Sequence, residues 1–172
     1  NMLSTKSTDT SGRTTKTDIN TYIEQVNLGV NYNLLAKLNL DLGVTYYKNL
    51  TQPSGDGASE DTTLTRFQPF AWLTLQDPMW LASLGYSLQE EALKTSGQPE
   101  HTLSRQTYAS YLNWRPTDLP STQFRYTRTI TQDDPRAFID TTEDYIFLKS
   151  EYIYGGLDTY YLGTYLLTDD SI

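Results

Sequence analysis

The chain has 172 residues, a formal net charge of −8 and no cysteine, and 37% of its residues are hydrophobic. The acidic balance argues against a general nucleic-acid surface, and the lack of cysteine excludes disulfides, a zinc ribbon and a thiol nucleophile of the chain's own. No run of about eighteen apolar residues occurs, so the sequence predicts no membrane-spanning helix. The 14 tyrosines favour strands.

The chain opens without the basic and apolar regions of a signal peptide, which predicts either a cleaved leader or a start inside a longer protein. Residues 1–9 predict a weak Thr- and Ser-rich strand. From Thr21 to Tyr47 the sequence then alternates with period two in two runs of about ten residues, the length of a tilted strand that crosses a bilayer. Successive side chains of a strand point to opposite faces, so these runs predict a hairpin with one apolar and one polar face. The predicted apolar face carries Val26, Leu28, Val30, Tyr32, Leu34, Leu38, Leu40, Leu42, Val44 and Tyr46.

Further strands are expected at 63–76, 80–92, 102–115, 122–131, 144–154 and 158–168. Pro69 lacks a backbone donor, which predicts a bulge or a locally open ladder in the first of them. Tight turns are expected near 35–37, 76–79, 116–120 and 155–157, and long polar loops near 51–62, 93–101 and 132–143. Short and long connections therefore alternate along the chain, as in barrels with short turns at one end and long loops at the other.

Alternation alone fits two kinds of protein. In a soluble sheet the apolar face points inward, whereas in a transmembrane barrel it points outward to lipid. Three features favour the membrane: the alternating connections, a polar face rich in Asn, Gln, Ser and Thr, and aromatic residues at the ends of the apolar faces. The expected aromatic girdle is Tyr32, Tyr46, Trp80, Tyr86, Trp114, Tyr126, Tyr152 and Tyr154.

The opposite parity supplies the side chains expected to face a lumen. They are Asp41, Arg66, Gln68, Arg105, Arg125, Lys149 and Glu151. Such charges either set the ion preference of a pore or neutralise one another in a plugged interior, and both readings remain open. Phe70 and Trp72 share this parity, which predicts a partly filled interior or a protein partner inside. Arg128 has the lipid-facing parity, close to the long-loop end where its head group could reach water.

No residue pattern predicts catalysis, a metal site or a cofactor. His101, the only histidine, is expected in a loop, and a triad or a histidine metal site needs more. The acidic pairs Glu90-Glu91 and Asp133-Asp134 are expected to solvate loop ends, or to bind divalent ions that bridge lipopolysaccharide. The protein is therefore not expected to be an enzyme.

The stretches L-N-L-D-L-G-V-T-Y-Y and Y-L-G-T-Y-L-L resemble the outer-membrane β-barrel class of Gram-negative bacteria, and the resemblance covers about residues 17–168. It implies a porin-like, all-β protein: one antiparallel up-and-down transmembrane β-barrel domain over residues 1–172, with short periplasmic turns and long extracellular loops. It implies location in the outer membrane, contact with the lipid bilayer and lipopolysaccharide, and a channel or a sleeve for a protein partner such as a cytochrome or an export protein.

One departure concerns the end of the chain, which reads Asp169-Asp170-Ser171-Ile172 and looks like a loop where such barrels have a final strand with a terminal aromatic. A second departure is the odd count of nine expected strands, because bacterial single-chain barrels have an even number of strands. Both predict that the chain is a segment of a larger barrel.

Two other classes remain open. One is a soluble β-barrel that binds a small apolar ligand. The other is a surface adhesion or assembly protein, which an open edge at 1–9 or 158–168 would favour. An outer-membrane enzyme is disfavoured because no nucleophile pairs with the histidine.

Overall fold

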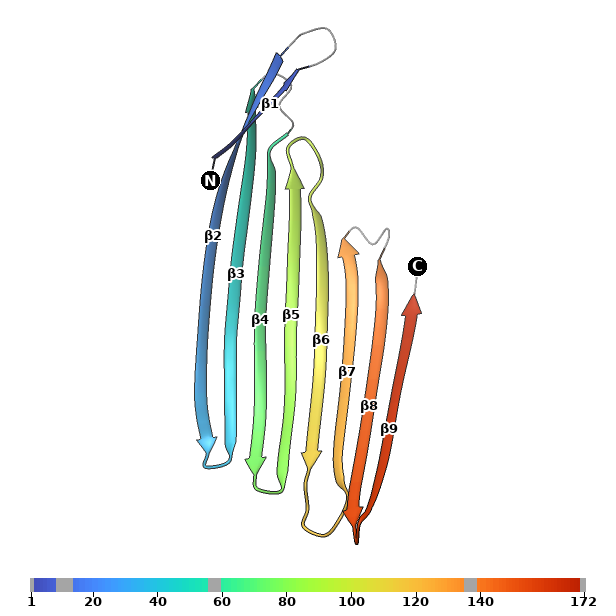
Figure 1. The fold of residues 1–172 in the computed structure, drawn as a ribbon. Coiled ribbons are helices and arrows are strands. Elements are labelled where there is room, and N and C mark those ends of the chain that lie inside the picture. Colours follow the sequence, from blue (N-terminus) through green and yellow to red (C-terminus); the bar gives the residue numbers. More distant parts are fainter. Residues whose placement is uncertain (1, 9–13, 56–59, 135–138, 171–172) are drawn as a thin grey trace.

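The protein is all-β, and its strands form one sheet (Figure 1). The computed structural model describes the backbone of residues 2–8, 14–55, 60–134 and 139–170, and the side chains from residue 18 onward within these ranges except that of Tyr154. The strands are β1 (Met2–Thr8), β2 (Thr14–Leu35), β3 (Leu38–Gly55), β4 (Thr62–Asp77), β5 (Trp80–Thr95), β6 (His101–Trp114), β7 (Ser121–Asp134), β8 (Asp140–Tyr154) and β9 (Leu157–Asp170). Among the described residues, no helix is long and apolar enough to span a membrane.

Strands that follow one another in the sequence are neighbours in the sheet, in the order β1 to β9, and every pairing is antiparallel. This confirms the predicted all-β, up-and-down arrangement. The sheet is open. β9 pairs only with β8, and residues 21–35 of β2 pair only with β3. The predicted closure into a barrel is therefore absent from the described chain.

Period-two alternation sets the two faces of the sheet, as predicted. Val26 pairs with Tyr46, Leu28 with Val44, and so on down the hairpin of β2 and β3. The register carries this parity through every later strand. One row of directly paired residues runs across the sheet through Val30, Leu42, Ala71, Tyr86, Tyr108, Arg128, Asp144 and Leu167. We call the side of these residues the apolar face, and the opposite side, which carries Asp41 and Arg66, the polar face.

The sheet has no apolar core of its own: none of the described hydrophobic residues is buried. On the apolar face Leu28 is 65% exposed, Val30 64% and Leu84 61%. Large exposed apolar surface on one face is typical of a contact with protein or membrane. The apolar face is therefore built to be covered by something outside the described chain.

The tight turns lie where the sequence predicts them. Ala36 and Lys37 join β2 to β3, and Gly155 and Gly156 join β8 to β9 with φ of 57° and 83°. Two central residues with positive φ match the twist of a two-residue hairpin, which is why glycine is suited to both positions.

The long connections are shorter than predicted, because the strands continue into them. β3 runs on to Gly55, with Pro53 paired to Ile19 of β2, and His101 is the first residue of β6, paired with Leu93, and not a loop residue. A neighbouring strand that supplies backbone hydrogen bonds overrides a weak strand propensity. Residues 56–59 and 135–138 of the predicted loops lie outside the described residues.

Pro69 opens the ladder locally, as predicted, but makes no bulge. On the β5 side the pairing passes from Phe67–Glu90 to Phe70–Ser87, with no pair at Gln68 or Pro69 and no change of register. On the other side Pro69 still lies opposite Val44. The missing N–H donor therefore weakens one ladder without shifting the parity of the side chains.

Candidate functional site

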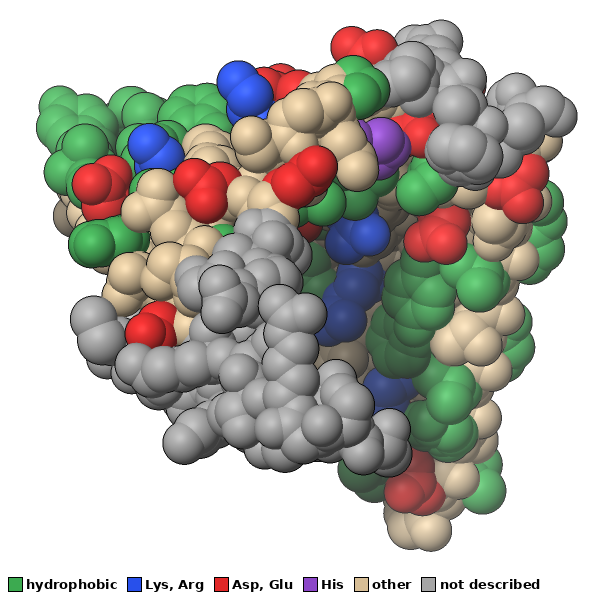
Figure 2. All heavy atoms as spheres, turned by 90° about the horizontal axis from the view of Figure 1, so that it is seen from above, with side chains coloured by type: hydrophobic (Ala, Val, Ile, Leu, Met, Phe, Trp, Pro, Cys, Tyr) green, Lys and Arg blue, Asp and Glu red, His purple; other side chains and the backbone are tan. Residues whose placement is uncertain are grey.

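The polar face lines a hollow. Seen down the strands, the molecule is hollowed on one side, and Lys and Arg side chains gather inside (Figure 2). The register places the seven predicted lumen residues on this face: Asp41 of β3, Arg66 and Gln68 of β4, Arg105 of β6, Arg125 of β7, and Lys149 and Glu151 of β8. They share one face, as predicted, but they are spread over several strands and form no single cluster.

Part of this charge is neutralised between neighbours. Arg66 donates from Nε and Nη2 to one oxygen of Glu91, at 2.9 and 2.7 Å, directly across the β4–β5 pairing. Lys149 Nζ lies 3.2 Å from Glu151 and 5.4 Å from the centre of the Tyr160 ring. These pairs correspond to the plugged-interior reading, in which charges compensate one another.

Arg125 differs from Arg66, because its partner is a ring. The Arg125 guanidinium lies 5.9 Å from the centre of the Tyr111 ring, directly across the β6–β7 pairing. No ion pair joins Arg125 or Arg105 to a carboxylate within the described part of the chain. These two residues therefore leave cationic groups available to a solute.

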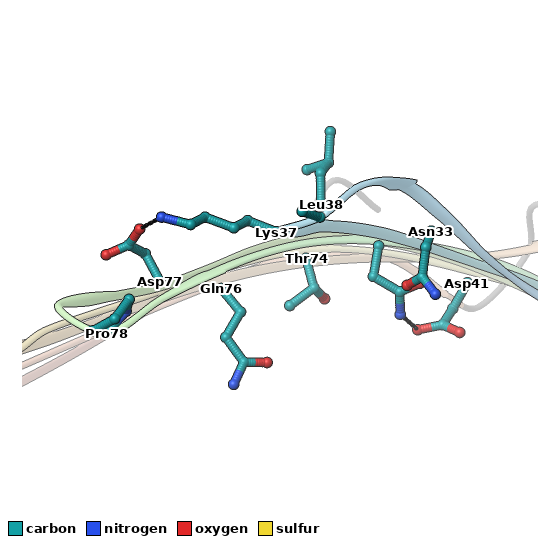
Figure 3. A pocket seen from close by; sticks show the side chains of 10 residues that line it. Asn33, Lys37, Leu38, Asp41, Thr74, Gln76, Asp77 and Pro78 are labelled. Atoms are coloured by element: carbon teal, nitrogen blue, oxygen red, sulfur yellow. Dashed lines mark hydrogen bonds and ion pairs between the residues drawn. The ribbon is translucent and has the colours of Figure 1, made fainter.

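Asp41 is held by two amides at the tight-turn end of the sheet. It accepts hydrogen bonds from Asn31 and from Asn39, the latter at 3.4 Å. Asp41 and Asn39 border a polar cavity of about 830 Å³ whose lining also includes Asn33, Thr74 and Gln76. In Figure 3 the side chains of Thr74, Gln76 and Asp41 point to one side of the strands, whereas Leu38 points to the other.

The first two tight turns are tied together beside this cavity. Lys37 forms an ion pair with Asp77, and the Gln76 N–H donates to the Lys37 carbonyl at 2.8 Å (Figure 3). The hydrogen bond from the Lys37 ammonium lowers the pKa of the Asp77 carboxyl below its ordinary value. The pair therefore fixes one hairpin to the next at this end.

Two rings of the polar face lie over glycines of the neighbouring strands. A Cβ built on Gly43 would come within 2.4 Å of the Phe70 ring, and one built on Gly85 within 2.4 Å of the Trp72 ring. Sequence reasoning placed both rings on this face but missed the glycines. An isolated glycine inside a strand signals a close approach of this kind, and that signal was present.

The acidic pairs do not both solvate loop ends. Asp133 is 2% exposed, accepts from the Ile139 N–H at 3.1 Å and lies 3.4 Å from His101 Nε2. Glu91 pairs with Arg66. The prediction of solvated ends is therefore wrong for Asp133 and Glu91. The described residues contain no group of three or more His, Cys, Asp or Glu placed to hold a metal ion.

The apolar face carries two aromatic pairs, both between β5 and β6. Trp80 stacks on Trp114 with ring centres 5.6 Å apart, and Tyr86 lies 5.1 Å from Tyr108. All the predicted girdle residues have the parity of this face in the register. The side chain of Tyr154 lies outside the described residues. Arg128 also has the apolar-face parity, and its Nε lies 3.5 Å from Asp144.

No family model, curated protein or solved structure matches this chain.

Proposed function

We propose that the chain is part of a transmembrane β-barrel of an outer membrane, with the apolar face toward lipid and the polar face toward a lumen. It acts there as a channel, or as a sleeve around a protein partner, and it performs no catalysis. The observation that carries this proposal is an apolar face that continues across the sheet, with Arg128 and Asp144 paired on it, while the described residues form no buried apolar core.

The length of the uncharged band suits a bilayer. On the apolar face of β5 the residues from Trp80 to Leu88 are uncharged, and the first charge is Glu90. At about 3.4 Å per residue, the span from Trp80 to Glu90 is about 34 Å. A strand tilted by about 36° needs about 31 Å to cross an apolar band about 25 Å tall.

The stagger of the strands supports the same tilt. The row of directly paired residues from Val30 to Leu167 serves as a reference line across the sheet. Val30 lies five residues from the tight-turn end of β2, whereas Leu167 lies ten residues from the tight-turn end of β9. At the other end Leu42 lies 13 residues from Gly55, and Leu167 lies three from Asp170. The strand ends therefore shift by five residues over seven strand steps at the tight-turn end and by ten residues over six steps at the other end. These values bracket the shift of one residue per strand that gives a tilt of about 36° in an eight-stranded barrel.

The first test compares the purified chain with and without detergent, followed by gel mobility of unheated and boiled samples. The proposal expects a protein that needs detergent and whose folded form migrates differently until it is boiled. Conductance in planar bilayers then separates an open channel from a filled sleeve. A monodisperse protein in plain buffer would rule out the lipid-facing assignment and favour a soluble β-barrel whose apolar face lines a ligand cavity.

The open edge of β9 favours a second candidate function, assembly by strand addition. β9 is apolar on both faces, with Tyr160 60%, Leu162 50% and Leu166 65% exposed on its polar-face side. Exposed edges of this kind pair with other chains. This candidate expects concentration-dependent oligomers in detergent-free buffer, whereas the barrel expects a fixed stoichiometry in detergent.

A further inference from the structure

A pocket of about 400 Å³ lies on the polar face between Trp72 of β4, Ala109 and Tyr111 of β6, and Arg125 and Thr127 of β7. Its volume falls within the range of small-molecule sites. The lining contains one charged side chain, Arg125, and no carboxylate. The pocket is therefore cationic, unlike the polar cavity beside Asp41.

The strand order explains why the Trp72 ring reaches this pocket. Trp72 pairs directly with Gly85 of β5, and Gly85 pairs in turn with Ala109 of β6. Since Gly85 has no side chain, the ring lies over its Cα, where a Cβ would come within 2.4 Å of Cε3 and Cζ3. The indole thus spans β5 and presents a flat apolar wall, with the small Ala109 beside it.

The opposite wall is polar. Arg125 lies 5.9 Å from the Tyr111 ring centre and has no carboxylate partner among the described residues. A guanidinium presents a fork of donors that fits a carboxylate with two parallel hydrogen bonds. Thr127, also in the lining, carries a hydroxyl that donates or accepts.

We propose that this pocket binds a sugar that carries a carboxylate. The apolar side of a pyranose ring fits against the Trp72 indole, the carboxylate against Arg125, and the ring hydroxyls against Thr127. This solute class rests on the proposed function, because a pocket on a lumen wall meets the solutes that enter the lumen. Binding itself requires only the pocket residues of β4, β6 and β7, in the positions that the open sheet already gives them.

The test is calorimetric titration of the folded protein with sodium glucuronate and, separately, with glucose. We expect glucuronate to bind at least about tenfold more tightly, because only the uronate offers a carboxylate to Arg125. Arg125→Gln should weaken glucuronate binding by about tenfold and leave the weak glucose binding unchanged. Arg105→Gln is the matched control, because Arg105 is also an unpaired cation of the polar face but lies outside the pocket lining.

Equal affinity for the two sugars, equal losses in Arg125→Gln and Arg105→Gln, or no binding of glucuronate to the wild type would each overturn this inference. Heat-modifiable mobility of the same preparation shows that every variant is folded. If that mobility persists while glucuronate does not bind, only the site is wrong. If the protein is monodisperse without detergent and still binds glucuronate through Arg125, only the proposed membrane location is wrong.

Discussion

At the scale of single residues, the sequence predicts which face a side chain takes but not what it touches. Parity placed Phe70 and Trp72 on the polar face from the sequence alone. That their rings lie over Gly43 and Gly85 depends on the register between neighbouring strands. Register is fixed by pairing over the whole strand, so local sequence carries little information about it.

The glycines under the rings should tolerate substitution worse than a glycine with space above it. Gly85→Ala would force the Trp72 ring to move, and such overpacking costs about 1–3 kcal/mol. Gly29→Ala is the matched control, because its Cβ would meet only the Leu42 carbonyl oxygen, at 3.7 Å. Denaturant unfolding followed by tryptophan fluorescence should show a lowered midpoint for Gly85→Ala alone. Equal midpoints would mean that the indole does not rest on Gly85.

At the scale of strands, the sequence predicts the central part of each strand well and the position of its ends poorly. The alternation of apolar and polar residues locates the central part, because each strand has one continuous apolar face. The ends contain Pro53, Gly55 and acidic residues that suggest loops, yet backbone pairing extends β3 and its neighbours through them. Such pairing depends on both strands together, and it therefore cannot be predicted from the sequence of either strand alone.

Adjacent residues of β5 separate the roles of the two faces. Leu84, on the apolar face, is 61% exposed and lies between Trp80 and Tyr86, the β5 members of the two aromatic pairs, whereas Ser83 is its neighbour on the polar face. Leu84→Arg should reduce folding into lipid vesicles, since arginine on a lipid-facing position near the midplane costs about 2–4 kcal/mol. Ser83→Arg should fold like the wild type. The measurement is the heat-modifiable fraction at increasing urea concentration, and identical curves would contradict a lipid-facing Leu84.

At the scale of the whole molecule, the number of strands follows from the sequence, and each tight turn predicts that the two strands it joins are neighbours. Closure does not follow. It depends on what pairs with β9 and with residues 21–35 of β2, and neither edge has a second neighbour in the described chain. The two edge strands run in opposite directions, as seen in Figure 1, which is the arrangement that antiparallel pairing between them would need.

The two open edges of the sheet, β9 and residues 21–35 of β2, allow a prediction about amide hydrogen exchange. Alternate N–H groups of an edge strand point away from the sheet, and within lipid each unpaired group costs several kcal/mol. In detergent or lipid we therefore expect the outward amides of 157–170 and 21–35 to exchange hydrogen as slowly as those of β5, because a further strand or a second copy pairs with them. Amide exchange measured by mass spectrometry at peptide resolution compares the three regions within one sample. If half of the β9 amides exchange at the rate of an exposed loop while β5 stays protected, the sheet remains open. The apolar face must then be covered by another protein and not by a bilayer.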